Sequence, residues 1–451
     1  MINKATLKEA KLFLQKHPDL EAVDLLLCDL NGILRGKRVE ASSLLKVYEN
    51  GVCLAESIWG SDITGETVQE TGFGFHTGEP DVLLFPIANS LQFSPWQQGR
   101  IAQLQLAMCD TQTLSYQIDP RQVLIRLSEQ FKKKNLQPMI ALELEFYLLP
   151  RCEKNSEHLV LDPAQGSTQV YSIDDLDEHA DFLRALSEAA GIQHIPVTSA
   201  VAEYAPGQFE INLIHEADAV SACDHAIELK RLIKGIAKQH GLQATFMPKP
   251  FIDFAGSGTH IHASLYDQKG KNIFYAKKDT VSEKLLFAVN GLIELMPESM
   301  LIFAPGANSY RRFVKDSYVA NSANWGINNR SVAVRIPLSE PKATRIEHRV
   351  SGADSNPYLL ASAIFAGMLY GLTQKTRPPA AIEGDAYEQN PRRPLPISWE
   401  QAIKSFKQSK ILRSYLGDPL TNAYHAIKVE EMSKFNRQVT PLEIDWYLVN
   451  S

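Results

Sequence analysis

The segment Met139–Leu149, MIALELEFYLL, decides the fold because it places two carboxylates inside an otherwise apolar strand. Alternate residues of a strand point to the same face, so Glu143 and Glu145 project together while Leu144 points into apolar packing. Two uncompensated carboxylates in such a strand are costly to desolvate. A hard cation such as Mg²⁺ or Mn²⁺ would remove that cost, and so would an edge position with one solvated face. Taken alone, the segment leaves both interpretations open.

Two motifs further along the chain carry groups that suit a metal ion or an anion. Glu203-Tyr-Ala-Pro-Gly-Gln-Phe-Glu210 has a Pro-Gly turn between two acids, which either brings them together or leaves them in solvent. Gly256-Ser-Gly-Thr-His260-Ile-His262 places a glycine-rich turn before a strand, with both histidines on one face. One histidine can ligate a metal and the other contact a phosphate, although a lone histidine is usually structural.

Three later segments are rich in arginine: Asn308–Arg312, Asn328–Arg335 and Lys342–Arg349. In the last of these, strand alternation places Arg345, Glu347 and Arg349 on one face. Such a face is either a surface ladder of ion pairs, which is worth little energetically, or a bidentate clamp for a carboxylate or phosphate.

The composition excludes several classes of protein. The chain has 451 residues, 44% of them hydrophobic, and its 46 Lys and Arg against 52 Asp and Glu give a net charge of −6, which disfavours nucleic-acid binding. Five cysteines without a C-x-x-C spacing predict a reducing compartment and neither a disulfide framework nor a zinc ribbon. The N-terminus is typical of an amphipathic helix, not a signal peptide, and the apolar segments 285–303 and 358–372 predict buried helices. We therefore expect a cytoplasmic protein without membrane contact.

The pattern of expected elements changes near Asp119-Pro120, which predicts an N-terminal domain of residues 1–115 and a body of residues 116–451. The first part is expected to hold strands at 23–30, 33–39, 82–86 and 101–108, with a hairpin at Asn31-Gly32. The body is expected to mix helices at 120–134, 175–191 and 217–240 with strands at 139–149, 209–213, 244–247 and 259–265. Residues 376–396 are expected to form an exposed loop, and the fold class is α+β.

In chain order, the motifs E-x-E, E-x-A-P-G-Q-F-E, F-M-P-K-P, G-S-G-T-H-x-H, N-S-Y-R-R, N-N-R-S and R-I-E-x-R resemble the glutamine synthetase superfamily over nearly the whole chain. Among its branches, the sequence looks most like the glutamate–putrescine ligases, through LELEFYLLP, GQFEINL, AGSGTHIH, NSYRRF and SGADSNPYL. The resemblance implies a β-grasp-like N-terminal domain and a catalytic domain with an antiparallel bifunnel sheet. It also implies a ring-shaped homo-oligomer, a dodecamer of two stacked hexamers, with active sites between neighbouring subunits.

The resemblance further implies roles for individual residues. Two or more Mg²⁺ or Mn²⁺ ions would be held by two sets of side chains, Glu145, Glu203 and Glu210 in one and Glu143, His260 and Glu347 in the other. Glutamate would be bound by Gly256, Arg312 and Arg349. The phosphates of ATP, the co-substrate, would meet the catalytic residues Arg330 and Arg335. The nucleotide side would also include His262, Ser264, Lys342 and Arg345.

Both acids that handle ammonium in glutamine synthetases proper are missing or displaced here. Tyr318 stands six positions after the second arginine of NSYRR, Ala255 replaces the usual Asn before the glycine turn, and the N-terminal loop reads CLAESIWGSD. Glu56 or Asp62 of that loop, from an adjoining subunit, is the candidate base. The pattern favours ATP-dependent ligation of the glutamate γ-carboxylate to a polyamine, putrescine first, through a γ-glutamyl phosphate.

Three alternatives stay open from the sequence. One is γ-glutamylation of another amine, such as spermidine, ethanolamine or a monoamine. Another is glutamine synthesis. The third, from a different class, is a non-catalytic structural member of the fold.

Overall fold

A hairpin at Asn31-Gly32 begins the N-terminal sheet, as the sequence predicts. The computed structural model describes residues 5–97, 100–109, 114–151, 170–277, 280–389 and 393–450. In it β1 (Ala22–Cys28) pairs antiparallel with β2 (Leu34–Glu40), and Gly32 takes the positive φ of 77° that the turn requires. The sheet order is β2-β1-β6-β4-β3, with β1 and β6 parallel. Its other elements are α1 (Leu7–Lys16), α2 (Leu44–Asn50), β3 (Val52–Ala55), β4 (Asp81–Pro86), β5 (Gln92–Phe93) and β6 (Ile101–Met108).

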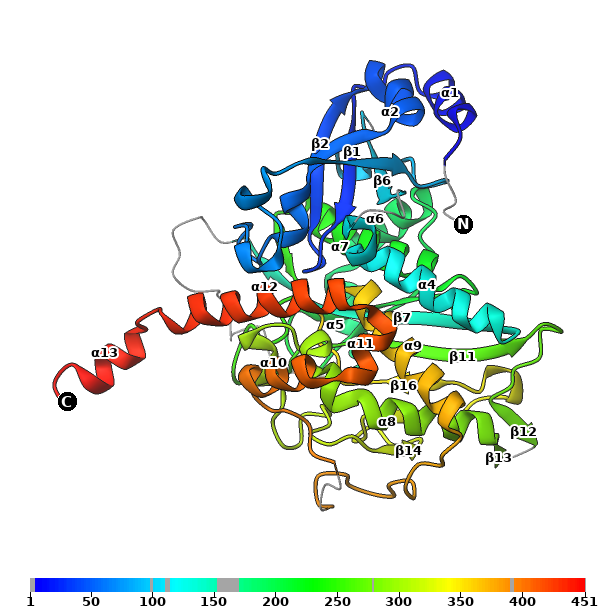
Figure 1. Ribbon diagram of the computed structural model, residues 1–451, viewed down its shortest axis with the longest axis vertical. Coiled ribbons are helices and arrows are strands. Elements are labelled where there is room, and N and C mark those ends of the chain that lie inside the picture. Colours follow the sequence, from blue (N-terminus) through cyan, green and yellow to red (C-terminus); the bar gives the residue numbers. More distant parts are fainter. Residues whose placement is uncertain are drawn as a thin grey trace.

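An eight-stranded sheet forms the centre of the body, below the N-terminal sheet in Figure 1. Its order is β14-β15-β16-β11-β7-β9-β8, and β10 pairs with β7. The strands are β7 (Leu136–Pro150), β8 (Val197–Ala202), β9 (Gln208–Leu213), β10 (Leu242–Thr245), β11 (Thr259–Asp267), β14 (Trp325–Ile327), β15 (Val334–Ile336) and β16 (Ile346–His348). Every pair is antiparallel except β14 with β15, which is parallel. The pair can be parallel because each strand has only three residues. The six residues 328–333 between them are enough to bring the chain back to the start of β14, so that β15 runs in the same direction.

The remaining elements are mostly helices. They are α3 (Leu114–Ile118), α4 (Pro120–Lys133), α5 (Ile173–Glu178), α6 (Ala180–Ile192), α7 (Ala219–Gln239), α8 (Glu283–Phe303), α9 (Pro357–Gln374), α10 (Trp399–Gln408), α11 (Lys410–Leu416), α12 (Asp418–Asn436) and α13 (Pro441–Tyr447), with a small ribbon of β12 (Tyr275–Lys277) and β13 (Thr280–Val281). The helix expected at 175–191 is divided at His179, whose φ and ψ of −105° and 17° leave the helical region. The strand expected at 244–247 lies two residues earlier and ends before Pro248, which cannot donate a ladder hydrogen bond. The domain boundary near residue 115 stays a prediction.

The two most apolar helices, α8 and α9, lie inside the body. Among the described residues α8 is the one helix long and apolar enough to cross a membrane, and 72% of its most apolar window is buried. Glycines allow close contact of the two backbones, since a Cβ at Gly371 would lie 1.9 Å from the carbonyl oxygen of Phe287. Both helices are therefore buried, as their composition predicts.

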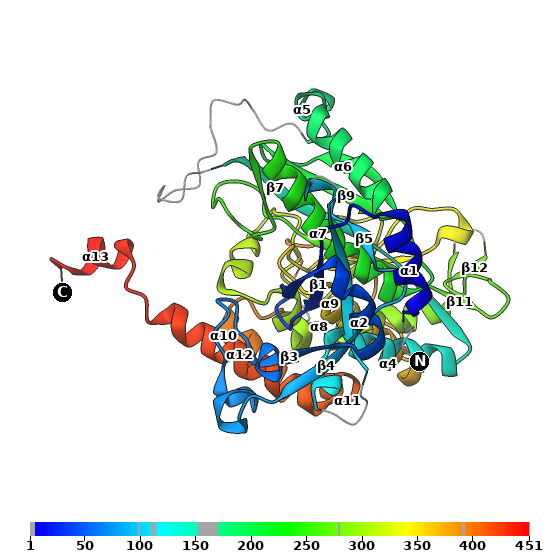
Figure 2. The same ribbon diagram turned by 90° about the horizontal axis from the view of Figure 1, so that it is seen from above.

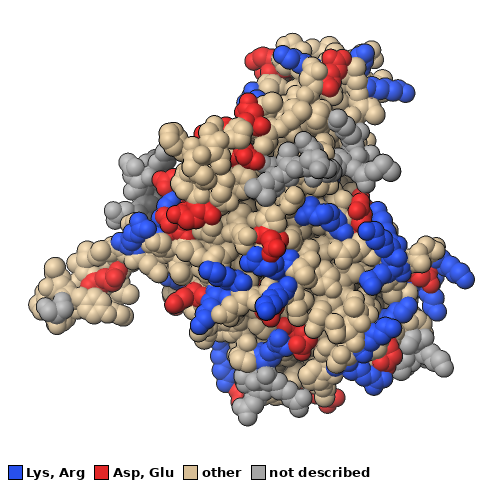
Figure 3. Space-filling model, in the orientation of Figure 1, with Lys and Arg blue, Asp and Glu red and all other residues tan. Residues whose placement is uncertain are grey.

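The C-terminal helices form an arm. Figures 1 and 2 both show α12 leading away from the body and α13 projecting beyond it. The end of this arm exposes six large apolar side chains: Leu442, Ile444, Trp446, Tyr447, Leu448 and Val449. Figure 3 shows acidic and basic side chains interspersed over one face of the molecule, so the net charge is not gathered there in one patch. Of the five cysteines, Cys28, Cys53 and Cys223 are free thiols, the Sγ atom of Cys109 donates to the carbonyl of Ala107 at 3.7 Å, and Cys152 lies outside the described residues.

Candidate active site

Pairing of β7 with β11 brings the two central glutamates to the two histidines. His260 stands opposite Glu143 in the ladder. The Oε2 atom of Glu143 lies 3.1 Å from Nδ1 of His260, and its Oε1 atom lies 2.8 Å from Nε2 of His262. Glu145 Oε1 lies 3.8 Å from Nε2 of His260, whereas Leu144, between the two glutamates, is fully buried. The two carboxylates thus share one face of β7, as strand alternation predicts.

The same face continues across β16 and β15. His262 is opposite Glu347, which is in turn opposite Arg335. Arg335 Nη1 donates to Glu347 Oε2 at 2.8 Å, and Arg349 donates to Glu347 Oε1. Burial raises the pKa of Glu347, but the charges of Arg349, His262 and His260 together outweigh burial and bring that pKa down to about 2. Glu347 is therefore a buried, ionised carboxylate.

A hairpin between β8 and β9 carries the next two acids. Gly207 in its turn has a positive φ of 69°, and a Cβ there would lie 2.7 Å from the carbonyl oxygen of Leu148. Glu210 stands opposite Glu145 in the ladder, and Glu203 begins the turn. Burial, together with the charges of nearby glutamates, raises the pKa of Glu203 to about 8 and of Glu210 to about 9. The carboxylates at this point repel one another, and a cation among them would relieve that repulsion.

Two sets of side chains have the geometry of a cation site. Glu143, His260 and Glu347 each offer a ligand atom within 4.8 Å of the others, and so do Glu145, Glu210 and His260. Oxygen-rich sets with one histidine suit Mg²⁺ or Mn²⁺. The first set is the grouping expected as the second metal site. In the other, His260 takes the place expected for Glu203, which lies close enough for the charge of Glu145 to act on its pKa.

The glycine turn before β11 packs tightly on an arginine. A Cβ at Gly256 would lie 2.7 Å from Cγ of Arg312, so only glycine fits there. The backbone N–H of Gly258 donates to Glu145 Oε2 at 2.7 Å. Arg312 donates through Nη1 to the carbonyl of Val350 at 3.1 Å. The turn therefore joins a candidate metal ligand to a candidate substrate arginine.

Three arginines of this region carry buried donors that lack an acceptor among the described residues. They are the Nε atoms of Arg312, Arg335 and Arg349. The Arg312 and Arg349 residues are only 3% and 6% exposed. A buried donor without a partner is costly, and an anionic substrate would satisfy it.

The ring of His262 also lines a cavity of about 400 Å³. Arg345 Nε donates to His262 Nδ1 at 3.0 Å, so the proton on Nε2 is directed at Glu143. Both side chains line the cavity together with His215, whose pKa burial lowers to about 4. His215 follows β9 and was singled out by no sequence motif. Of the other expected nucleotide residues, Ser264 is buried in β11 and Lys342 is exposed between β15 and β16.

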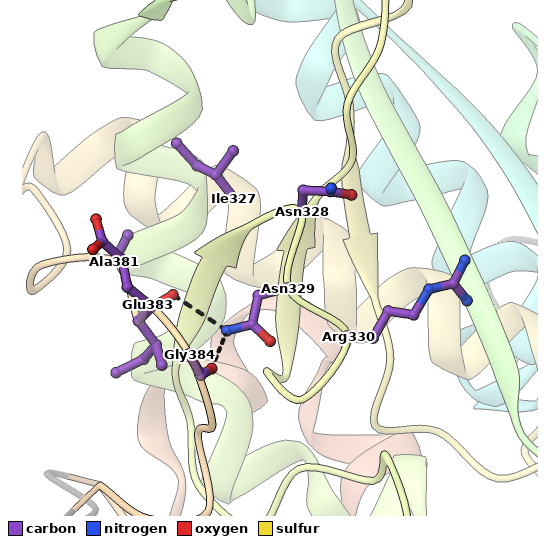
Figure 4. A pocket seen from close by; sticks show the side chains of 8 residues that line it. Ile327, Asn328, Asn329, Arg330, Ala381, Glu383 and Gly384 are labelled. Atoms are coloured by element: carbon purple, nitrogen blue, oxygen red, sulfur yellow. Dashed lines mark hydrogen bonds between the residues drawn. The ribbon is translucent and has the colours of Figure 1, made fainter.

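Arg330 lies on the turn between β14 and β15. Figure 4 shows the Asn329 side chain directed at the segment 381–384 and Arg330 pointing away from it. Asn329 Nδ2 donates to the carbonyls of Ile382 and Gly384, at 3.3 and 2.8 Å. The charge of Arg330 offsets part of the rise in the pKa of Glu203, so the guanidinium lies close enough to act on that carboxylate.

The two candidate bases lie between β3 and β4 of the N-terminal sheet. Glu56 begins a short 3-10 helix after β3, and its backbone N–H donates to the carbonyl of Pro80 at 2.9 Å. Asp62 is buried and pairs with Lys434 of α12 at 2.5 Å. Burial raises the pKa of Asp62, but Lys434 and hydrogen bonds from Thr64 and Glu66 lower it overall. Asp62 is thus held as a carboxylate where the segment between β3 and β4 contacts α12.

Comparison with known proteins places this arrangement in a family. Residues 117–447 match the family model of the glutamine synthetase catalytic domain, and the chain is a ligase of the glutamine synthetase family. It is 43% identical to gamma-glutamylputrescine synthetase PuuA of Escherichia coli strain K12, over 98% of this chain and 95% of that protein. It is 32% identical to a glutamate–isopropylamine ligase of a Pseudomonas species, over 99% and 98%. The solved structure of GmaS without ligand superposes with a TM-score of 0.84 at 26% identity, covering 97% of this chain and 98% of that one. The family and the fold class predicted from the motifs are confirmed.

Proposed function

We propose that this protein joins the γ-carboxylate of glutamate to an amine of a polyamine, putrescine first, with hydrolysis of ATP to ADP and phosphate. One observation carries the proposal: two carboxylate–histidine sets and three arginines with unpartnered buried donors converge on one face of the central sheet. Two relatives are a γ-glutamylputrescine synthetase and a glutamate–isopropylamine ligase, and their activities support an amine other than ammonium.

The acidic and the basic side chains of the site would have different roles. Glu143, Glu145, Glu210, His260 and Glu347, with Glu203 beside them, would hold Mg²⁺ or Mn²⁺. When bound, such ions neutralise charge on the phosphates and the carboxylate. Arg312 and Arg349 have buried donors for glutamate, with Gly256 against Arg312, whereas Arg330 and Arg335 face the transferring phosphate. His262, Ser264, Lys342 and Arg345 belong to the nucleotide side.

The reaction needs two displacements. A γ-carboxylate oxygen of glutamate attacks the terminal phosphorus of ATP, and ADP leaves. The amine nitrogen then attacks the γ-carbonyl carbon of the acyl phosphate, and phosphate leaves. An alkylamine has a pKa near that of lysine, about 10.4, and arrives protonated, so a base must accept a proton. Glu56 or Asp62 of an adjoining subunit would accept the proton, and the ion pair with Lys434 makes Asp62 a weaker base than a free aspartate would be.

Assembly and location complete the proposal. The apolar end of α13 is too exposed to stand alone in water, which supports burial against a second copy in a ring-shaped homo-oligomer of stacked hexamers. A cytoplasmic location agrees with the free thiols of Cys28, Cys53 and Cys223.

The decisive experiment measures phosphate release with ATP, Mg²⁺ and glutamate against ammonium, putrescine, spermidine, ethanolamine, isopropylamine and methylamine. We expect putrescine to give the highest kcat/KM. A preference for ammonium over every amine would overturn the proposal. If the protein is instead a non-catalytic structural member of the fold, the native protein should bind no Mn²⁺ in a calorimetric titration.

A further inference from the structure

A second cavity, of about 290 Å³, lies beside the turn that carries Arg330. Its walls come from three loops and consist of Asp316, Tyr318, Asn329, Arg330, Ser331, Asp385 and Tyr387. The volume is close to the lower limit of about 300 Å³ for small-molecule sites. We call it the loop cavity. None of its acids belongs to the candidate metal sets, so it is separate from them.

The loop cavity adjoins the point where the amine must react. The resemblance to glutamine synthetases implies that Tyr318 stands where those enzymes have an acid that handles ammonium. Its ring lies beside that of Tyr204, with centroids 6.0 Å apart. Tyr204 follows Glu203 directly in the chain, and Arg330 lines the cavity while acting on the pKa of Glu203. One end of the loop cavity therefore meets the reaction centre.

The walls of the loop cavity carry two carboxylates, those of Asp316 and Asp385, and both lie close enough to Lys315 to raise its pKa. Among the described residues neither Asp316 nor Asp385 forms an ion pair, and the nearby Lys315 is paired with Glu388 at 2.5 Å. Asp385 accepts one hydrogen bond, from the backbone N–H of Tyr387 at 2.8 Å, and a carboxylate has room for more. Asp316 is held in the left-handed region, with a φ of 64° that few non-glycine residues adopt.

Aromatic rings complete the environment. Tyr387 is fixed by a hydrogen bond from its hydroxyl to the carbonyl of Val319 at 2.9 Å. Tyrosine rings attract ammonium groups through their faces, and they cover the methylene groups between two such charges. The combination of two carboxylates and two tyrosines suits an alkyl chain that ends in a cation.

We propose that the loop cavity is the subsite for the distal ammonium group of a diamine, with Asp316 and Asp385 as its counter-charges. The reacting amine then lies at the Tyr318 and Arg330 end, next to the acyl phosphate. The inference rests on the proposed function and adds what that function lacks, a structural reason for preferring a diamine to a monoamine. Arg330 is compatible with it because the phosphate neutralises that guanidinium.

The test compares putrescine with butylamine, which has the same carbon chain but no distal charge. Kinetics are measured with saturating ATP and glutamate for the full-length protein and its Asp316→Asn and Asp385→Asn variants. Asparagine keeps the shape and tolerates the left-handed backbone of residue 316. Asp181→Asn, on the exposed face of α6, is the matched control. We expect each cavity variant to lose at least tenfold in kcat/KM for putrescine, mainly through KM, and less than twofold for butylamine.

The possible results distinguish an error in the proposed subsite from an error in the proposed function. Wild-type protein that prefers putrescine while both variants keep that preference would overturn the subsite alone. Equal losses for putrescine and butylamine would also overturn it, because they would indicate a general structural role. Wild-type protein that uses no amine would overturn the proposed function and the subsite with it.

Discussion

The backbone N–H of Gly258 donates a hydrogen bond of 2.7 Å to Oε2 of Glu145. This bond fixes one oxygen of the glutamate, while the other faces His260 at 3.8 Å. This hydrogen bond therefore joins β7, which carries candidate metal ligands, to the turn of residues 256–258, which packs on Arg312. The candidate cation site and the candidate glutamate site are therefore connected through two residues that lie more than a hundred positions apart in the sequence.

Replacing Glu145 by Gln tests the metal site. The amide keeps the acceptor for Gly258 but removes the charge, so we expect Mn²⁺ affinity to fall by about 10- to 100-fold. Isothermal titration calorimetry of the two proteins measures the change. Glu188→Gln, an exposed position on α6, is the control and should bind as wild type. Unchanged affinity in Glu145→Gln would remove Glu145 from the metal site.

Neighbouring arginines allow a matched test of glutamate binding. Arg312 is buried with an unpartnered Nε, whereas Arg311 beside it is exposed. Lysine keeps the charge but cannot place two parallel donors, so Arg312→Lys should raise the KM for glutamate at least tenfold and leave that for ATP nearly unchanged. Arg311→Lys should change neither value by more than twofold. A rise confined to the KM for ATP would assign Arg312 to the nucleotide instead.

Local patterns predicted much of this site. Strand alternation in β7 correctly predicted that Glu143 and Glu145 share one face, and Asn31-Gly32 correctly predicted the first hairpin. Both features could be predicted because each depends only on residues that are close in sequence. The overall fold and the roles of distant motifs came from resemblance, since pairing of β7 with β11 is set by tertiary packing and not by any local period.

Other features had no local signal. The break between α5 and α6 falls at His179, whose ring packs on Phe209 with centroids 4.9 Å apart. Asp316 and Asp385 lie in separate loops, and neither has a spacing that marks it before the loops are folded together. Features of this kind depend on contacts between distant segments, which periodicity does not encode.

Glu228 makes stability depend on pH. This side chain of α7 is buried, accepts a hydrogen bond from Gln105 at 2.7 Å, and faces the charged groups of His225, Asp224 and Arg121. Burial raises its pKa from 4.5 to about 7. The folded state then binds more protons at Glu228 than the unfolded state between these values, so the contribution of Glu228 to stability is full below pH 4.5, falls between pH 4.5 and 7, and levels off above pH 7.

Glu228→Gln should remove that loss, because the amide cannot ionise and still accepts from Gln105. We expect the variant to gain up to about 3 kcal/mol over wild type at pH 8 and little at pH 5. Urea unfolding at the two pH values measures the difference, with the exposed Glu49→Gln as control. An equal effect at both pH values would mean that Glu228 acts through packing and not through its charge.

Gly371 tests the contact between α8 and α9. A Cβ at this position would lie 1.9 Å from the carbonyl oxygen of Phe287 and 2.9 Å from the backbone nitrogen of Gly291. Both atoms belong to the backbone of α8, so the helices must separate, and we expect Gly371→Ala to cost about 3 kcal/mol or more. Gly191→Ala is the matched control, since that helical glycine of α6 has nothing within 4 Å of its Cβ position and alanine should stabilise it by about 0.5–1 kcal/mol. Opposite shifts in Tm, downward for residue 371 and upward for residue 191, are the expected result, whereas an unchanged Tm in Gly371→Ala would contradict the close backbone contact of the two helices.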